Sequence, residues 1–237
     1  MKSWKTESGY EIFRVLSGRS NSYFISASAH NILVDTGSEA GFFKLKAGMN
    51  LLYLPHTKIS FLILTHTHFD HCQNAAKIKA EEGCKIVISK DGKESAEYGY
   101  SKLPKGVFPV TKPITLLGNL IGKKKFGFEP FNADIFVEDE FDFINYSLKI
   151  KLIKTAGHSL DSISVIVDNE VAIVGDTMFG IFKNSALPPF ADSPAEIMVS
   201  WKRLLDSGSN MFLPGHGREI KRDLLQKEYD RLKEKFV

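Results

Sequence analysis

Short apolar runs rich in β-branched residues recur along the chain, and most of them end at a turn or a polar cluster. Runs of this length and composition are typical of β-strands. The predicted strands span residues 31–37, 59–68, 85–90, 148–158, 162–168, 171–176 and 211–217. Residues 60–65 and 171–175 favour strands that are covered on both faces, whereas the alternation in 147–153 favours one solvated face. The stretch VDNEV at 167–171 predicts a tight hairpin turn.

Helical patterns fall between the predicted strands. Residues 193–205 begin with Ser-Pro-Ala-Glu, a capping box with proline at the first helical position, and end before Gly208. The apolar stripe of this helix is Ile197, Met198, Trp201, Leu204 and Leu205. Further helices are predicted over 71–82, ending at Gly83, and over the charged C-terminal stretch 218–236. Because helices and strands alternate, the sequence predicts a layered α/β domain.

One long stretch, residues 91–142, lacks a clear period and is rich in Gly, Pro, Lys and Phe. A connection of this length is more often a functional lid or an inserted subdomain than an idle loop. We therefore expect a single domain over residues 1–237 that carries a lid or inserted subdomain at about 91–142.

Composition places the chain among globular proteins, with 43% hydrophobic and 25% charged residues in a length of 237. No run approaches the roughly 18 apolar residues of a membrane span, and the N-terminus has no signal-like apolar region. The expectation is a cytoplasmic protein with no membrane partner. A net charge of +3 gives no argument for a nucleic-acid partner. The oligomeric state stays open, a homodimer included.

Ligand-type side chains crowd into THTHFDH, directly after a predicted strand. His66 and His68 are two positions apart, so at a strand end they point to the same side and can grip one metal ion. Asp70 and His71 follow where the chain leaves the strand, which lets them face a neighbouring position. Four residues do not complete such a site, so further ligands are expected elsewhere.

Three distant residues are candidates for those ligands. His158 in TAGHS and His216 in PGHG each follow an apolar run beside a glycine, and Asp176 ends another run. Residues at strand ends converge on one edge of a layered α/β domain, so these segments can meet the first cluster. His30 and His56 match no such pattern and are expected to be structural.

The motifs THTHFDH, TAGHS, VGDTMF and PGHG, in this order, resemble the metal-binding motifs of the metallo-β-lactamase-fold hydrolases. The likeness is greatest to the glyoxalase II (hydroxyacylglutathione hydrolase) branch. VDTG at 34–37 matches an early turn of the same superfamily, so the resemblance covers residues 31–217. It implies a four-layer αββα sandwich with the metal site at the edge between the two sheets.

The resemblance also implies a set of ligands for two divalent metal ions. His66, His68 and His158 would hold the first ion, Asp70, His71 and His216 would hold the second, and Asp176 would bridge them. Imidazole and carboxylate ligands suit zinc, iron or manganese; zinc is the first expectation. By sequence proximity, the groups that orient these ligands are expected among Asp35, Thr65, Ser159 and Thr177.

The implied activity is hydrolysis of an ester, thioester or lactone bond in a small-molecule substrate by a metal-bridging hydroxide, which Asp70 would orient. The sequence leaves the substrate unassigned. Tyr98 or Tyr100 from the predicted lid would assist a lactonase. Cys72 is expected to be a small buried side chain, and both it and Cys84 are expected to be reduced.

Three other activities remain open at this point. Persulfide dioxygenases share the first motif but use a single iron ion. Phosphodiesterases and nucleases of the fold share the ligand set, but residues 91–142 offer one lysine triplet, 123–125, as a basic surface. A metal-binding protein without turnover is the third, and the complete ligand set argues against it.

Overall fold

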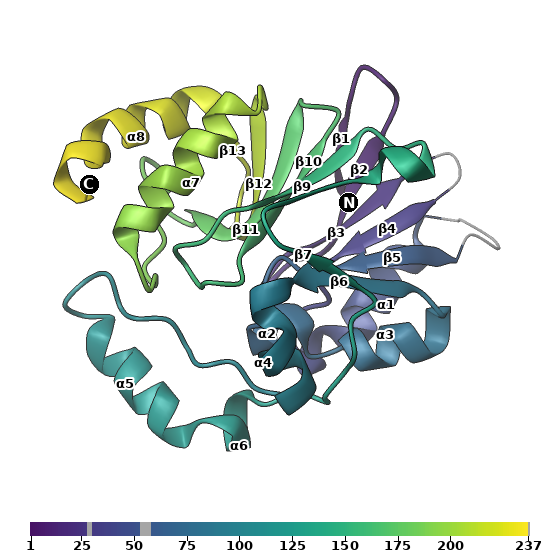
Figure 1. The fold of residues 1–237 in the computed structure, drawn as a ribbon, viewed down its shortest axis with the longest axis horizontal. Helices are drawn as coiled ribbons and strands as arrows, with labels where there is room; N and C mark the ends of the chain where they lie inside the picture. The colour runs from purple at the N-terminus through teal and green to yellow at the C-terminus, as the bar shows by residue number, and fades with distance from the viewer. Residues whose placement is uncertain (28–29, 53–57, 237) are drawn as a thin grey trace.

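The protein is described by a computed structural model that covers residues 1–27, 30–52 and 58–236. Two mixed β-sheets form its centre (Figure 1). The first sheet has the strand order β1 (Lys2–Lys5), β2 (Glu11–Leu16), β3 (Ser22–Ser26), β4 (Asn31–Val34), β5 (Ile59–Ile63), β6 (Lys85–Ser89), β7 (Ile135–Val137). The second sheet has the order β13 (Ile220–Lys221), β12 (Met211–Gly217), β11 (Val171–Gly180), β10 (Ile163–Val167), β9 (Ile150–Lys154), β8 (Glu140–Asp142).

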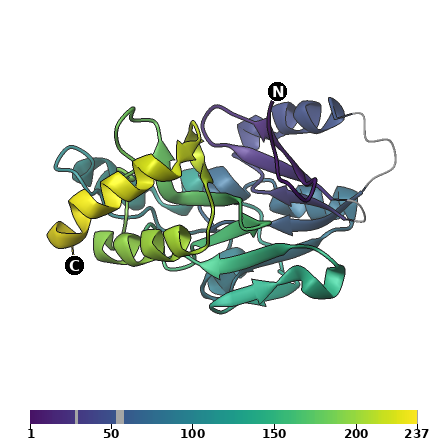
Figure 2. The ribbon, with the colours of Figure 1, turned by 90° about the horizontal axis from the view of Figure 1, so that it is seen from above.

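Apolar side chains fill three interfaces between four layers. Inward-facing residues of both sheets share one core, for example Ile32 and Ile63 of the first sheet with Val165 of the second. The helices α1 (Phe42–Asn50) and α3 (Ala75–Glu82) cover the outer face of the first sheet. On the second sheet lie α7 (Pro194–Asp206) and α8 (Arg222–Phe236), side by side (Figures 1 and 2). The predicted four-layer αββα sandwich is therefore confirmed.

The predicted capping box begins α7 as expected. Ser193 Oγ accepts a hydrogen bond of 3.2 Å from the backbone N–H of Glu196, and Pro194 occupies the first turn. All five residues of the predicted apolar stripe are buried. One of them, Trp201, also donates its indole N–H to the carbonyl of Thr177 at 2.8 Å. Both the predicted start of this helix and the face that it buries are therefore confirmed.

The predicted hairpin turn joins β10 to β11. The loop between the paired residues Val167 and Val171 has three residues. Its first two, Asp168 and Asn169, both have φ of 56°, and the Glu170 N–H closes the turn on the Val167 carbonyl at 3.0 Å. The two strands pair antiparallel on either side of it. In contrast, β1 to β3 were not predicted, because β1 is a largely exposed edge strand and the polar positions in β2 and β3 interrupt their apolar patterns.

The predicted strand over 59–68 is too long, since β5 ends at Ile63. Beyond this point carboxylates hold the backbone: Asp35 accepts from the N–H of Thr65 at 2.8 Å, and Asp161 accepts from that of Thr67 at 2.8 Å. The predicted helix over 71–82 is likewise divided, into α2 (Phe69–Cys72) and α3. The first histidine motif thus lies on a loop and a short helix.

Residues 91–142 contain both sheet strands and a projecting part. β7 and β8 are edge strands of the two sheets, so the predicted insertion extends too far toward its C-terminal end. The projecting part contains α5 (Lys112–Ile121) and α6 (Lys123–Phe126), which lie away from the sheets in Figure 1. On α5 the residues Thr115 and Gly118 face inward, whereas most of its large apolar side chains are exposed.

Hydrogen bonds from an asparagine attach α5 to the chain that precedes it. The side chain of Asn119 accepts from the backbone N–H of Leu103 at 2.8 Å and donates to its carbonyl at 3.0 Å. Leu103 fits against Gly118, where a Cβ atom would lie 2.5 Å from its Cδ1. No helix in the part of the chain that the structure describes has the length and apolar character to span a membrane.

Replacement of Ser193 by alanine tests the role of the capping box. The variant loses the acceptor for the Glu196 N–H, so we expect its free energy of unfolding to fall by about 1 kcal/mol in denaturant titrations. Ser193→Asp retains a capping oxygen and should stay close to the wild type. An alanine variant as stable as the aspartate variant would contradict this role.

Candidate metal centre

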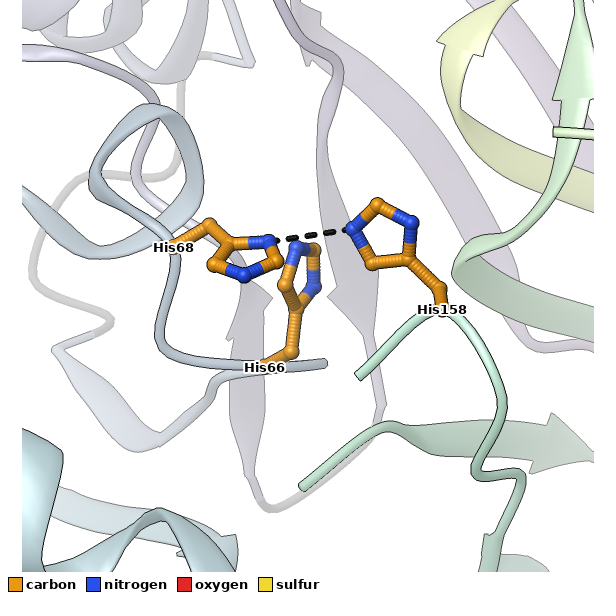
Figure 3. A group of neighbouring side chains, drawn as sticks. All are labelled: His66, His68 and His158. Atoms are coloured by element: carbon orange, nitrogen blue, oxygen red, sulfur yellow. Dashed lines mark hydrogen bonds between the residues drawn. The ribbon is translucent and has the colours of Figure 1, made fainter. Parts of the chain in front are cut away.

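Three histidines converge from loops at the edges of the two sheets (Figure 3). His66 and His68 lie on the loop after β5, and His158 lies on the loop after β9. His68 Nδ1 and His158 Nε2 are 3.0 Å apart. One nitrogen from each of the three rings falls within 4.8 Å of the others, and all three residues are buried. Their arrangement could hold one metal ion.

A second group lies beside the first. It consists of Asp70 and His71 from α2 and His216 from β12, again with ligand atoms within 4.8 Å of one another. His71 Nε2 lies 3.4 Å from His216 Nε2, and Asp70 Oδ2 lies 3.7 Å from that same atom.

Asp176, at the middle of β11, contacts both groups. Its Oδ2 lies 3.5 Å from His158 Nε2 and 3.2 Å from His216 Nε2, and its Oδ1 lies 3.3 Å from His71 Nε2. The structure thus brings together all seven residues predicted as ligands. We call them the His/Asp cluster, formed by His66, His68, Asp70, His71, His158, Asp176 and His216.

Two of the predicted orienting groups contact ring nitrogens that face away from the centre of the cluster. His71 Nδ1 lies 2.8 Å from Asp35 Oδ2, and the hydroxyl of Thr65 lies 3.1 Å from His66 Nδ1. The predictions for Ser159 and Thr177 are wrong, because their hydroxyls bond to Ser162 and to Thr155. Proximity in sequence did not fix the direction of these two side chains.

Two backbone carbonyls complete the outer contacts. His68 Nε2 donates to the carbonyl of Lys102 at 3.0 Å, and His158 Nδ1 donates to that of Phe190 at 2.8 Å. Sequence analysis missed both, since a carbonyl carries no residue-type signal. Metal-ligating histidines usually have such a partner on the second nitrogen, which fixes the tautomer and the ring orientation. Four of the five histidine rings in the His/Asp cluster thus already have, on their outer nitrogen, the kind of partner that metal-ligating histidines usually have.

Burial lowers the pKa of His158 to about 4 and that of His66 well below its usual value. Both rings are thus neutral at neutral pH, which is the form that binds metals. Burial also acts to lower the pKa of His71, but Asp176 and Asp35 outweigh it and raise this pKa. For Asp176, burial acts to raise the pKa, but the neighbouring His216, His71 and His158 hold it well below its usual range.

Two buried atoms of the cluster have no hydrogen-bond partner among the described residues: His66 Nε2 and Asp176 Oδ1. The latter lies near His71 Nε2 without the alignment of a hydrogen bond. A buried polar atom left unpaired costs about 1–3 kcal/mol. A cation among the imidazoles and carboxylates would satisfy both atoms, so the residues fit a divalent metal; this donor set suits zinc, iron or manganese.

Glycines allow the second sheet to approach the cluster. A Cβ atom on Gly215 would lie 2.3 Å from Asp176 Oδ1 and 2.6 Å from His71 Cε1. Gly175 has φ of 48°, and a Cβ there would lie 2.5 Å from the hydroxyl of Thr65. Gly215, which precedes His216 in PGHG, is therefore required for the close approach of its strand to Asp176 and His71, as its motif suggested.

A cavity of about 380 Å³ opens onto the cluster. Asp70, His158, Asp176 and His216 form its polar floor, and its walls are largely apolar, with Arg19 as a charged lining residue. Tyr98 and Tyr100, predicted as lid residues, line a different cavity of about 720 Å³ that borders only His68 of the cluster.

Cys72 and His30, which lie outside the cluster, have hydrogen-bond partners of their own. Cys72 is buried, its thiol donates to the carbonyl of Thr67 at 3.3 Å, and burial raises its pKa well above the usual value. It is the small buried side chain that was expected. His30 lies 3.1 Å from the hydroxyl of Ser60, away from the cluster, and His56 lies outside the described residues.

Known proteins of similar sequence or fold place the chain in a wider group. A relative from Caenorhabditis elegans, a beta-lactamase-like protein 2 homolog, is 26% identical over 84% of this chain, which spans 56% of the relative's length. A hydroxyacylglutathione hydrolase from Nitrobacter winogradskyi is 27% identical over a region that covers 51% of this chain and 34% of the length of that enzyme. The solved metallo-beta-lactamase with a HARLDQ motif from Cronobacter sakazakii has a TM-score of 0.69 at 16% identity, covering 100% of this chain and 93% of its own.

The family model of the metallo-beta-lactamase superfamily matches residues 17–217. This range contains every residue of the His/Asp cluster and most strands of both sheets. The chain therefore belongs to the metallo-beta-lactamase superfamily.

Proposed function

We propose that the protein is a dinuclear metal-dependent hydrolase that cleaves an ester, thioester or lactone bond in a small molecule. The observation that carries the proposal is the position of Asp176, whose carboxylate contacts histidines of both ligand groups. A carboxylate in this position can bridge two cations. Zinc is the first expectation, with iron or manganese as alternatives.

Each part of the cluster has a proposed role in binding. His66, His68 and His158 would hold one ion, while Asp70, His71 and His216 would hold the other. When bound, such ions would supply a water whose pKa lies near about 7 and a Lewis acid for the substrate carbonyl. The protein contributes neutral, oriented imidazoles, because burial keeps His66 and His158 unprotonated and the outer contacts fix their rings.

Asp70 is the proposed catalytic residue besides its role as a ligand. Its carboxylate lines the cavity over the cluster, where it can accept a hydrogen bond from the attacking water and orient it. The backbone of Asp70 is held by Ser20, whose hydroxyl donates to the Asp70 carbonyl. This contact helps to position Asp70 at the cavity.

The similarity to a hydroxyacylglutathione hydrolase makes thioesters the first substrates to test. The test measures metal per chain by elemental analysis, followed by hydrolysis of a panel of thioesters, esters and lactones. About two equivalents of metal together with turnover support the proposal. One equivalent of iron with oxygen consumption on a persulfide would instead identify a dioxygenase. Bound metal with no turnover would indicate a metal-binding protein.

Asp176→Asn tests the bridging role with little change in shape. The amide cannot supply a negative charge to two cations, so we expect metal content to fall by about half or more and hydrolysis to drop by at least about 100-fold. Asp206→Asn, at an exposed carboxylate on α7, is the matched control and should retain both properties. Full activity in Asp176→Asn would exclude a bridging carboxylate.

Asp35→Asn tests whether this buried carboxylate positions His71. The substitution keeps the size of the side chain but weakens its contact with the His71 ring. We expect metal affinity, measured by competition with a chromogenic chelator, to fall about 10–100-fold. The introduced amide still provides an oxygen for the Thr65 N–H, so the fold should persist; unchanged affinity would assign Asp35 a purely structural role.

Removal of metal should destabilise the protein. Chelation leaves His66 Nε2 and Asp176 Oδ1 buried without a partner and removes the binding free energy that metal adds to folding. We expect the thermal midpoint measured by circular dichroism to fall by several degrees and to recover when metal is restored. The midpoint of Asp176→Asn should respond much less to the chelator. Equal responses in both proteins would argue against the cluster as the metal site.

A further inference from the structure

We infer that the cavity over the His/Asp cluster takes a substrate with an apolar acyl group, whose leaving group carries an anion that Arg19 recognises. The inference rests on the proposed function for its reaction, but the pocket and the arginine are observations of their own. We call this cavity the acyl pocket; Phe69, Leu103, Ile114, Phe126, Phe179 and Arg19 are the lining residues on which the inference depends.

The acyl pocket joins an apolar wall to a polar floor. Its volume of about 380 Å³ falls in the range of roughly 300–1,000 Å³ that is usual for small-molecule sites. The polar groups on its floor belong to the cluster, where the reacting carbonyl would lie, while aromatic and aliphatic side chains surround the space above. A polar acyl group would lose its hydration there without gaining partners, whereas an apolar one gains by burial.

Contacts within the wall hold it in shape. The rings of Phe69 and Phe126 pack with centroids 4.9 Å apart, which joins α2 beside the cluster to α6. Leu103 is held by the side chain of Asn119, and both Leu103 and Phe126 lie against Gly118. Phe179 stacks on the ring of His216, with centroids 4.6 Å apart. The wall is thus built from α2, from the projecting part of the chain and from β11.

Two neighbouring residues of α5 provide a matched pair for testing the wall. Ile114 lines the acyl pocket, whereas Leu117 is not among its lining residues. Their exposed fractions are nearly equal, at 58% and 62%. A polar substitution at either position therefore has a similar effect on stability, and only the substitution at Ile114 changes the pocket.

Arg19 gives the pocket a positive group at the side of Phe69. Its guanidinium lies over the Phe69 ring, 5.4 Å from the centroid. Stacking of this kind orients the planar group and leaves its N–H donors free to form paired hydrogen bonds with a carboxylate or phosphate. The side chain is exposed, so an anion on a leaving group that extends out of the pocket can reach it.

The reaction needs water as its only co-reactant. Oxygen from water bonds to the acyl carbon, the carbon–sulfur bond of the thioester breaks, and its electron pair stays on sulfur. The sulfur ends as a thiol with one proton from the water, and the carboxylic acid formed releases the other. The products are an apolar carboxylate and an anionic thiol.

The first experiment measures binding and does not require turnover. Calorimetry of the metal-loaded protein with butyrate and octanoate compares two product-like acids that differ by four methylenes. Burial of each methylene contributes up to about a threefold to fourfold gain, so we expect octanoate to bind at least about tenfold more tightly. Ile114→Asn should reduce this ratio and Leu117→Asn should leave it unchanged. Equal dissociation constants for the two acids would overturn the acyl pocket, as would an equal loss in both variants.

The second experiment tests Arg19 with a pair of substrates. Octanoyl-coenzyme A and octanoyl-N-acetylcysteamine share the acyl group and the thioester, but only the first carries phosphates. We expect Arg19→Gln to lower kcat/KM for the coenzyme A thioester about tenfold or more, through a higher KM. Its kcat/KM for the neutral thioester should not change. Arg19→Lys keeps the positive charge and should restore part of the loss. Equal losses on both substrates, or none, would overturn the role of Arg19.

The two failures can be told apart. If no thioester, ester or lactone is hydrolysed while octanoate still binds more tightly than butyrate, the proposed function fails and the acyl pocket stands. If acetyl and octanoyl thioesters are hydrolysed equally well and the acids bind equally, the proposed function stands and the inference about the substrate fails.

Discussion

The structure depends on one buried carboxylate held among imidazoles. Asp176 lies within 3.2–3.5 Å of nitrogens from His216, His71 and His158. A charge in the protein interior is tolerated only when it is paired or binds a cation. That requirement explains why glycines at 175 and 215 let strand β11 and the loop of the first motif approach so closely. The facing edges of both sheets are shaped around this contact.

The projecting part of the chain is joined to the cluster by its backbone. The carbonyl of Lys102 accepts from His68, and the carbonyl of Phe190 accepts from His158. These two segments also bond to each other, since the Val107 N–H donates to Pro189 and the Ala191 N–H donates to Lys105. The segment that forms one wall of the acyl pocket thus also orients two of the histidines. The proposed substrate pocket and the His/Asp cluster therefore share one structural unit.

Much of the fold could be predicted because apolar runs reflect burial directly. Strands β9 to β12 of the second sheet, the start of α7 at Ser193 and the turn at Asp168 and Asn169 were located from the sequence. The short edge strands β8 and β13 were missed, since they lie within the predicted insertion and the predicted C-terminal helix, and the predicted strand over 148–158 extends past the end of β9. Strands β1 to β3 were missed, because β1 is largely exposed, Arg14 interrupts the apolar pattern of β2, and serines bound the short apolar run of β3. The end of β5 was misplaced, because side chains of Asp35 and Asp161 replace the expected strand partners there.

By itself the sequence determined which side chains are candidates for a metal site, through the motifs at the ends of apolar runs and their resemblance to a known family, and the structure brings all seven together in the cluster. It also named Asp35 and Thr65 as neighbours of the ligands. Only the tertiary structure decided the distances within the cluster, the carbonyls that orient His68 and His158, and the joining of Arg19 with the apolar wall of the pocket. The physical reason is that residue type specifies what a group can bind, whereas the packing of distant segments specifies where it points.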